Sequence, residues 1–499
     1  MQLLLAFTPI LLILIGIVVL KKPAWIVSVI ALTYTIVLAM LSFNEGIDLP
    51  GIGAQSYSGI VSALQTMFLV WGAFSLLELM ISSGGINTIK VTIGSFTNDR
   101  RVQVILIAFC FGTFVEGVTG AGAPAALLAP FLLVLGFPPI TAAAACLIAN
   151  GMSPSFGGAG VPTIIGMGGI TAEPYNMDLN SIVAGTGLFH MAGALLIPIV
   201  IMLVIFGRKS LKGMWGYILV SGGSMAITMF LVTYFMGPEF PSFITGIVGT
   251  AISVLYLHFI KVKPNPEFAN DVDLAMKTEL SVGKSFLPYV LVSVMLPVVR
   301  FSVPLQYLLM VGYSTWIGMV LHICVLISAI ALGCFRKWLG CVVTALKKIL
   351  AAAAAMCALL ALSNIMNYSG MMSIIAGSMA SAAGQAYPII AVIIGSLGAF
   401  ITGSNLGSNR LFAPMHVDAG MLLHINPVML AAANNGGGAL GNMICTNNII
   451  AVNATLDLKN SEGEVLARTI KAWLILAIVY GGLAMLYCHL LFPEFKWAW

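Results

Sequence analysis

The chain has 499 residues and a formal net charge of +5; 60% of its residues are hydrophobic and only 8% are charged. About a quarter of the residues in a soluble globular domain are charged, so this composition excludes a soluble fold. The small positive charge is expected to reflect the lysine and arginine residues that orient the chain in a membrane, and no nucleic-acid partner is indicated. The eight cysteines show no paired spacing, so neither a disulfide framework nor a metal site nor another cofactor is expected.

Apolar stretches of about 17–25 residues, the length that crosses a bilayer, recur along the whole sequence. They predict an all-α polytopic membrane protein with about 12 transmembrane helices. The expected spans are 3–20, 23–43, 56–82, 139–165, 184–206, 214–235, 240–260, 284–300, 313–334, 345–366, 427–455 and 469–491. The first has no basic residue before it and no small-residue cleavage site after it, so we interpret it as a retained span and not as a signal peptide.

Two further apolar segments, 102–136 and 387–423, contain glycine-rich breaks, and each is long enough to enter the membrane and return. The breaks read Gly112-Thr-Phe-Val-Glu-Gly-Val-Thr-Gly-Ala-Gly-Ala-Pro124 and Gly398-Ala-Phe-Ile-Thr-Gly-Ser-Asn-Leu-Gly-Ser-Asn-Arg410. Each is followed by an alanine-rich helix that is predicted to unwind, at Asn150 in the first half and at Asn434-Asn435 in the second. Backbone that leaves a helix at membrane depth must line an enclosed or watery cavity. Matching breaks in two halves therefore point to the binding site of a transporter.

Lysine and arginine residues indicate the orientation if both broken segments are re-entrant hairpins. Nearly all of them then fall on one side, with Arg300, Arg410 and Lys496 as the exceptions, and the positive-inside rule makes that side cytoplasmic. The predicted location is the bacterial cytoplasmic (inner) membrane, with both termini extracytoplasmic. The chain, 1–499, is then one transporter unit whose halves form an inverted repeat. Its parts are element 56–165 with hairpin 102–136, element 345–455 with hairpin 387–423, and the remaining spans as scaffold.

The candidate substrate site consists of residues at these breaks. A buried anion needs hydrogen-bond donors, which the amino ends of short helices and the amides of asparagine supply. The candidate substrate-binding residues are Gly120, Gly122, Asn150, Ser153, Ser404, Asn405, Ser408, Asn409, Arg410, Asn434 and Asn435. Each also has a structural interpretation, because asparagine and serine can satisfy freed backbone groups and glycine allows helices to pack closely. For Arg410, whose planar guanidinium suits a carboxylate, the alternative is an ion pair with Glu116.

Ionisable residues within membrane segments are by default functional candidates. Glu116 lies near the tip of the first hairpin, where it could take up and release a proton. His416 and Asp418 form a second candidate for proton coupling, with the wet outer end of a short helix as the alternative. His190 and His322 are interpreted as hydrogen-bonded structural histidines.

At these residues the chain resembles the L-lactate permease family of bacterial carboxylate transporters. The resemblance covers most of the chain and is strongest over Phe114-Val-Glu-Gly117, Leu135-Gly-Phe-Pro-Pro139, Leu147-Ile-Ala-Asn150, Thr402-Gly-Ser404, Ser408-Asn409, Leu411-Phe412, Asn426-Pro-Val428 and Ala431-Ala-Ala-Asn434. It implies proton-coupled uptake of lactate, glycolate and related 2-hydroxy acids, with elevator-type movement of a hairpin-bearing domain. The chain departs from the family pattern at Asn405, where an acidic residue is usual, and at Arg410, where a small residue is usual.

The sequence therefore predicts a symporter for a small organic anion, with L-lactate, glycolate or a related 2-hydroxy monocarboxylate as the first expectation and the proton as the coupling ion. Membrane lipid is the expected surrounding. A sodium-coupled carrier, a carrier of a different organic anion and an anion channel are the alternatives. An enzyme is not expected, because the sequence contains no His-Glu-x-x-His helix and no Gly-x-Ser-x-Gly elbow. The sequence leaves open the identity of the anion and the oligomeric state, including a homodimer.

Overall fold

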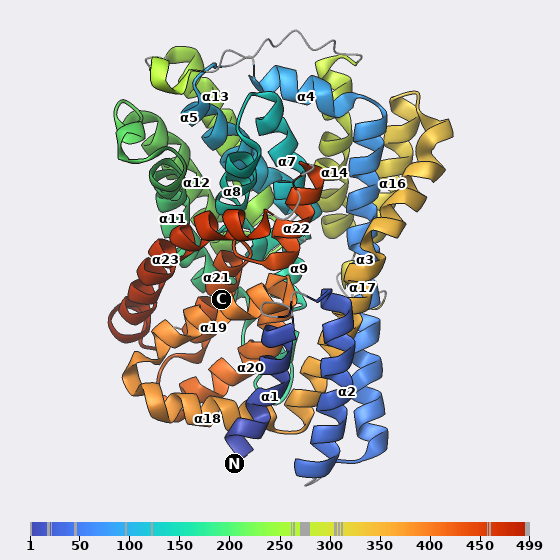
Figure 1. Cartoon of the computed structure of the whole chain (residues 1–499), viewed down its shortest axis with the longest axis vertical. Coiled ribbons are helices and arrows are strands. Elements are labelled where there is room, and N and C mark those ends of the chain that lie inside the picture. Colours follow the sequence, from blue (N-terminus) through green and yellow to red (C-terminus); the bar gives the residue numbers. More distant parts are fainter. Residues whose placement is uncertain are drawn as a thin grey trace.

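The computed structural model of the chain describes residues 2–16, 20, 22–43, 47–94, 97–120, 123–260, 262, 265–269, 280–303, 307, 310, 313–456, 458 and 461–494. Within these ranges the chain is almost entirely helical (Figure 1). The first helices are α1 (Gln2–Leu14), α2 (Ala24–Ser42), α3 (Leu49–Ser82), α4 (Gly85–Gly94), α5 (Arg100–Val104), η2 (Ile105–Phe111), α6 (Gly112–Thr119), α7 (Ala123–Val134), α8 (Pro139–Ala149), η3 (Ser153–Phe156), α9 (Gly157–Ile164), α10 (Gly168–Thr171), α11 (Leu179–Ile201), α12 (Trp215–Phe235) and α13 (Pro241–Phe259). They are followed by α14 (Val282–Ser302), α16 (Tyr313–Ala331), α17 (Phe335–Tyr368), α18 (Met371–Ala383), α19 (Tyr387–Thr402), α20 (Asn405–Leu423), α21 (Pro427–Gly441), α22 (Thr446–Thr455) and α23 (Glu462–Leu486).

Seven helices of the described residues are long and apolar enough to cross a membrane. They are Trp25–Ser42, Arg100–Thr119, Leu179–Phe206, Trp215–Phe235, Pro241–Phe259, Gly377–Phe400 and Glu462–Leu491. The pair Phe335–Ala351 and Ala353–Tyr368, bent by 44°, adds an eighth if it is counted as one span. The structure thus confirms an all-α protein of membrane-spanning composition, while the larger count of spans, the re-entrant hairpins and the inverted repeat stay predictions.

The first broken segment is a continuous helical arm from α5 to α6, followed after a break by α7. The arm ends at Gly120, whose φ of 64° is one that residues with a Cβ rarely adopt. The two arms pack closely, because a Cβ on Gly112 of α6 would lie 3.1 Å from Leu128 of α7. Residues 101–119 are all buried inside the protein, so this arm makes its contacts with other helices and not with the surroundings. The next helix, α8, ends at Asn150 as predicted.

The second broken segment consists of α19 and α20. Gly403 ends α19 in the left-handed conformation, with a φ of 77°. Ser404 then caps α20, since its Oγ accepts a hydrogen bond from the amide of Leu406 at 3.2 Å. A left-handed glycine followed by an N-cap serine ends one helix and starts the next within two residues. The two helices pack against each other, which brings the polar residues of α20 into the protein.

The helix after the second break, α21, is not broken, which corrects one prediction. The sequence predicts unwinding at Asn434-Asn435, but α21 continues through these residues without interruption. The glycines that suggested a break serve packing instead. A Cβ on Gly437 would clash with the carbonyl group of Val392 in α19, and Ser396 Oγ of α19 donates to the carbonyl of Gly437 at 2.7 Å. Small residues of this kind let two membrane helices approach closely.

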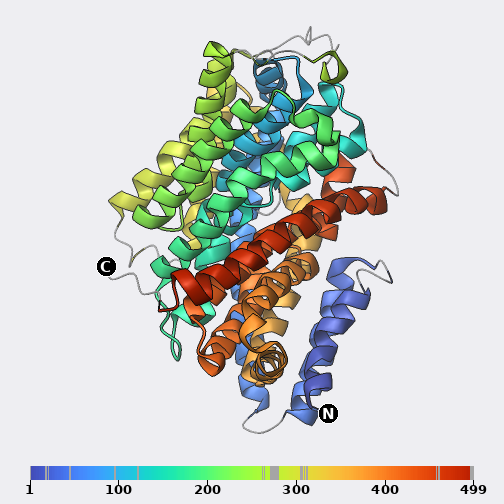
Figure 2. The ribbon, with the colours of Figure 1, turned by 90° about the vertical axis from the view of Figure 1, so that its left-hand side faces the viewer.

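Two long helices, α3 and α17, run side by side along the molecule (Figure 1). Trp71 Nε1 of α3 donates to the carbonyl of Val342 of α17 at 2.8 Å, and Glu78 forms an ion pair with Lys348. The helices α2 and α16 pack on this pair, whereas the broken segments pack mainly on α13 and α21. The helix α23 crosses the α21 region obliquely (Figure 2). The broken segments are therefore held by a different set of helices from the long pair.

Candidate functional site

Four asparagines from the second half form a buried cluster between α20 and α21. Asn405 and Asn409, one turn apart on α20, both donate from Nδ2 to Oδ1 of Asn435, at 2.8 and 2.9 Å. Asn434 Nδ2 donates to Asn409 Oδ1 at 3.0 Å. The four side chains are at most 2% exposed. Burying unpaired amides is costly, so a cluster whose members bind one another is a defined arrangement and not a chance contact.

The first half of the chain completes this cluster, which we call the amide cluster, with three hydroxyl groups. Asn435 Nδ2 donates to Thr163 Oγ1 of α9 at 2.8 Å and to Thr186 Oγ1 of α11 at 3.1 Å. Ser155 of η3 donates from Oγ to the backbone carbonyl of Asn435 at 3.0 Å and accepts from Asn405 Nδ2 at 3.1 Å. Asn435 is thus hydrogen-bonded to residues of both halves of the chain.

Two histidines bind the cluster from opposite sides, each paired with a tyrosine. His190 of α11 lies 2.7 Å by Nε2 from Ser155 Oγ, and its Nδ1 lies 3.3 Å from the hydroxyl of Tyr480 in α23. His416 of α20 lies 3.1 Å by Nε2 from Asn434 Oδ1, and its Nδ1 lies 3.1 Å from the hydroxyl of Tyr387 in α19. All these side chains are buried. One imidazole from α11 and one from α20 therefore contact the cluster.

Sequence reasoning missed part of this arrangement. Thr163, Thr186, Tyr387 and Tyr480 are not among the predicted site residues, and no spacing in the sequence links them to the asparagines. His190 is hydrogen-bonded, as interpreted, but it binds the amide cluster and not an isolated backbone group. One signal was present: Asn405, Asn409 and His416 have the spacing i, i+4 and i+11 that places side chains on one face of a helix.

A second polar cluster lies at the first broken segment. Asn150 Nδ2 donates to Glu116 Oε2 at 3.3 Å, and Ser153 Oγ donates to Asn150 Oδ1 at 2.7 Å. All three side chains are at most 5% exposed. The Glu116 carboxylate also lies against the α carbon of Gly157, where a side chain would collide with it. The structure therefore brings Glu116, a candidate for proton coupling, together with Asn150 and Ser153, two of the substrate-binding candidates, and their role in transport stays a prediction.

The backbone beside Glu116 forms a left-handed turn. Gly158, Ala159 and Gly160 have φ values of 51°, 57° and 78°. A left-handed alanine is unusual, because its Cβ crowds the following carbonyl. Gly120 packs directly on this turn, since a Cβ on it would lie 2.9 Å from the amide nitrogen of Gly158. Gly120 is therefore a close-contact residue between the first break and α9, while Gly122 lies outside the described residues.

The charged residues of α20 lie apart from the amide cluster. Arg410 Nη1 donates to the carbonyl of Ile165, at the end of α9, at 3.3 Å. No ion pair joins Arg410 to Glu116, both of which the structure describes. Asp418 accepts a hydrogen bond from the hydroxyl of Tyr175 at 2.7 Å, whereas the two ring nitrogens of His416 face Tyr387 and Asn434.

The two remaining predicted residues, Ser404 and Ser408, make hydrogen bonds within the second broken segment. Ser404 caps α20, as described above, and Ser408 Oγ donates to the carbonyl of Gly395 in α19 at 2.7 Å. Ser408 thereby holds the two arms of the second segment together.

The chemistry available at the amide cluster is hydrogen bonding without fixed charge. Its groups are amides, hydroxyls and imidazoles, and no group of three or more metal-ligating side chains occurs in the part of the chain that the structure describes.

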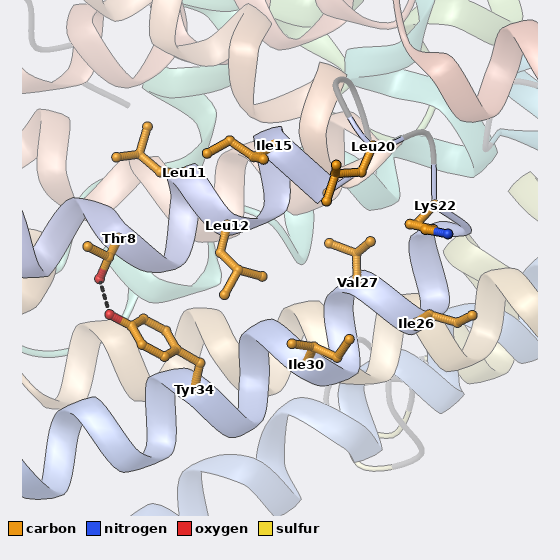
Figure 3. Close-up of a pocket in the computed structure, with 11 residues that line it drawn as sticks. Thr8, Leu11, Leu12, Ile15, Leu20, Lys22, Ile26, Val27, Ile30 and Tyr34 are labelled. Carbon is orange, nitrogen blue, oxygen red and sulfur yellow. Dashed lines mark hydrogen bonds between the residues drawn. The ribbon is translucent and has the colours of Figure 1, made fainter.

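A separate groove of about 600 Å³ lies between α1 and α2 (Figure 3). Its lining is almost wholly apolar, apart from Lys22 and the hydrogen-bonded pair Thr8 and Tyr34 at 2.8 Å. Compared with this groove, the amide cluster is the better candidate for a polar solute, because its side chains are amides and hydroxyls.

Helices of membrane-spanning composition around a buried polar cluster place the chain in the class of multi-pass membrane permeases. The family model described as L-lactate permease matches residues 2–317 and 302–491, and the chain therefore belongs to the L-lactate permease family. This confirms the resemblance drawn from the sequence. The chain is accordingly a transporter of small organic acids.

Curated relatives match almost the full length. The chain is 28% identical over 543 residues to glycolate permease GlcA of Escherichia coli K12, covering 97% of this chain and 95% of the relative. It is 29% identical over 466 residues to the L-lactate permease of Streptococcus iniae, covering 88% and 95%. Among solved structures, MtrF of Neisseria gonorrhoeae aligns with a TM-score of 0.47 and 12% identity, covering 89% of this chain and 85% of that chain.

Proposed function

We propose that the protein is a secondary active symporter that moves L-lactate, glycolate or a related 2-hydroxy monocarboxylate together with protons, by alternating access of the elevator type. The observation that supports this most directly is the amide cluster. It is buried, it joins the two halves of the chain, and it consists of groups that bind a small polar solute without holding it irreversibly. The proposed setting is the bacterial inner membrane, with both termini outside the cytoplasm.

The donors of the cluster fit the proposed substrate. A carboxylate that leaves water must regain hydrogen bonds, and a 2-hydroxy acid also brings a hydroxyl that both donates and accepts. Asn405 and Asn409 supply amide N–H groups from one side, and Thr163 and Thr186 supply hydroxyls from the other. The donor amides therefore suit the carboxylate. The threonine hydroxyls donate their own protons to the backbone carbonyls of Ser155 and Ile182, so they can accept a hydrogen bond from the 2-hydroxyl group.

The coupling proton is proposed to bind at Glu116. Its carboxylate is buried and bound by the amide of Asn150, which lies at the end of α8. Burial disfavours a lone negative charge, so protonation and substrate entry can be linked at this position. His416 and Asp418 are the second candidates, and His416 has the advantage of contacting Asn434 directly.

The elevator proposal is supported by how the polar contacts are distributed. Among the described residues, the contacts of Trp71 and Glu78 with α17 stay within the long helix pair. The bonds of the amide cluster stay among the broken segments, α11, α21 and their neighbours. A bond from Ser363 Oγ of α17 to the carbonyl of Arg410, at 3.2 Å, crosses from one set of helices to the other. Apart from this one bond, the polar bonds named here stay within each set, which supports movement of the broken segments with α11 and α21 against the long pair as one body.

The test is transport by the purified protein in proteoliposomes. Labelled L-lactate or glycolate should show saturable counterflow, and a pH gradient, acid outside, should drive accumulation in potassium medium without sodium. Accumulation that needs a sodium gradient would replace the proton by sodium. Strictly electrodiffusive flux without counterflow would contradict the carrier and favour an anion channel.

A further inference from the structure

A pocket with two basic side chains lies where the helices α3, α16 and α17 come together. Its volume is about 880 Å³, and the residues that line it include Ser82, Ile330, Phe335, Arg336 and Lys337. None of the described residues that line it is acidic. We call it the basic pocket. It shares no described residue with the amide cluster or with the groove between α1 and α2, so it is a separate feature of the fold.

The positive charge of the basic pocket is not compensated within the described part of the chain. Arg336 and Lys337 are both exposed, and neither forms an ion pair with a residue that the structure describes. Lys337 Nζ donates to the carbonyl of Ser82 at 3.1 Å, which fixes it at the end of α3 and leaves two further ammonium protons. Lys348 of the same helix is instead paired with Glu78 of α3. The basic pocket therefore suits an anion.

Two exposed apolar stripes run from the basic pocket along α16 and α17. The stripe of α16 consists of Ile323, Ile327 and Ile330, and the stripe of α17 consists of Phe335, Leu339 and Val343. The spacings i, i+4, i+7 and i, i+4, i+8 place each set on one face of its helix. Ile330 and Phe335 also line the pocket. Lipid tails are as apolar as leucine, so these faces suit acyl chains that end at a basic recess.

The residues around the basic pocket are typical of the level of the lipid headgroups. The ring of Phe335 stacks on that of Trp338, with 6.2 Å between the centroids and 2° between the planes. Tryptophan is enriched where a membrane meets water, and lysine and arginine anchor helix ends there. The positive-inside rule predicts that this side is cytoplasmic, and the anionic lipids of that leaflet attract basic residues beside membrane helices.

We propose that the basic pocket binds the headgroup of an anionic phospholipid, with the phosphate between Arg336 and Lys337 and the acyl chains along the two stripes. The planar fork of an arginine and the point charge of a lysine both bind phosphate oxygens. A soluble anion would leave the stripes unused, and a lipid without net charge would leave the excess positive charge unused. The inference does not depend on which solute the protein carries.

The first test compares two lipids with the same acyl chains. Dioleoyl phosphatidylglycerol, added to the purified protein in a neutral detergent, should raise the melting temperature, whereas dioleoyl phosphatidylcholine should not. Arg336→Gln combined with Lys337→Gln should bind phosphatidylglycerol at least about tenfold more weakly than the parent. Arg336→Lys combined with Lys337→Arg keeps both charges and should keep the response. Equal stabilisation by the two lipids, or an undiminished response in the double glutamine variant, contradicts the proposal.

The matched control is the other adjacent pair of exposed basic residues, Arg208 and Lys209, which do not line the pocket. Arg208→Gln combined with Lys209→Gln removes the same charge and should respond to phosphatidylglycerol as the parent does. An equal loss in both double glutamine variants would show a general effect of surface charge and overturn the site.

The second test separates the lipid from other occupants of the basic pocket. Glycerol phosphate carries the charge of the headgroup without the chains, and it should not stabilise the parent at the concentrations at which phosphatidylglycerol does. Stabilisation by glycerol phosphate to the same extent would assign the pocket to a soluble anion. Native mass spectrometry should show phosphatidylglycerol retained on the parent and lost from the double glutamine variant at Arg336 and Lys337. A dimer that dissociates in this variant would assign the surface to a second copy of the chain instead.

Discussion

Asn409 provides the sharpest test of whether the amide cluster stabilises the fold. Its amide makes three hydrogen bonds, to Pro162, Asn435 and Asn434, at 2.9, 2.9 and 3.0 Å. Asn409→Leu keeps the branching at Cγ and removes all three. Side-chain hydrogen bonds in membrane proteins are worth about 0.6 kcal/mol on average and up to about 1.7 kcal/mol. The expected loss is therefore about 2–5 kcal/mol, measured as a fall in the melting temperature of the purified protein.

Asn453 in α22 is the matched control. It is 1% exposed, and neither its Nδ2 nor its Oδ1 has a hydrogen-bond partner in the described part of the chain. Asn453→Leu removes two buried polar atoms that bind nothing, so it should leave the melting temperature unchanged or raise it. The reasoning is refuted if Asn409→Leu melts with the parent, or if both leucine variants fall by the same amount.

Three further outcomes are expected in transport and binding assays. Glu116→Gln should abolish accumulation driven by a pH gradient and leave lactate exchange largely intact; undiminished accumulation would remove Glu116 as the proton site. Arg410→Ala should change anion affinity by less than about threefold, because Arg410 lies apart from the amide cluster and binds the carbonyl of Ile165; a loss of tenfold or more would show that Arg410 is the anion anchor. A bifunctional thiol reagent that joins Thr141→Cys to Arg468→Cys, positions now linked by a 2.8 Å hydrogen bond between the halves, should leave transport intact; inactivation would mean that the halves separate during the cycle.

The positions of both breaks could be predicted from the sequence because their signals are local. A left-handed glycine and a capping serine, such as Gly403 and Ser404, define a helix end within a few residues. Asn150 ends α8 without the left-handed conformation, with a φ of −80° and a ψ of 10°, and its signal is the local sequence Asn150-Gly-Met-Ser-Pro. Such features depend only on neighbouring residues, so one sequence is sufficient to find them.

The continuity of α21 could not be predicted, because glycine has two uses in a membrane helix. It weakens a helix that stands alone, and it also allows another backbone to approach. Which use applies at Gly437 depends on Val392 and Ser396, which lie in a different helix. The hydroxyls that complete the site could not be predicted for the same reason, because they too lie in other helices. Thr163 and Thr186 are 272 and 249 residues from Asn435, a pairing that the packing of α11 on α21 and of α9 on α20 creates.

The amide cluster also bears on how access can alternate. Ser155 with Asn405 and Thr163 with Asn435 are bonds between the two halves of the chain, and all four side chains are buried. If the halves rocked apart to open a passage, these bonds would break inside a membrane, where freed polar groups find few substitutes. If the broken segments, α11 and α21 move together against α3 and α17, the same bonds persist throughout the cycle. The cluster that would recognise the substrate would then also hold the moving body together, which favours the elevator over a rocking movement.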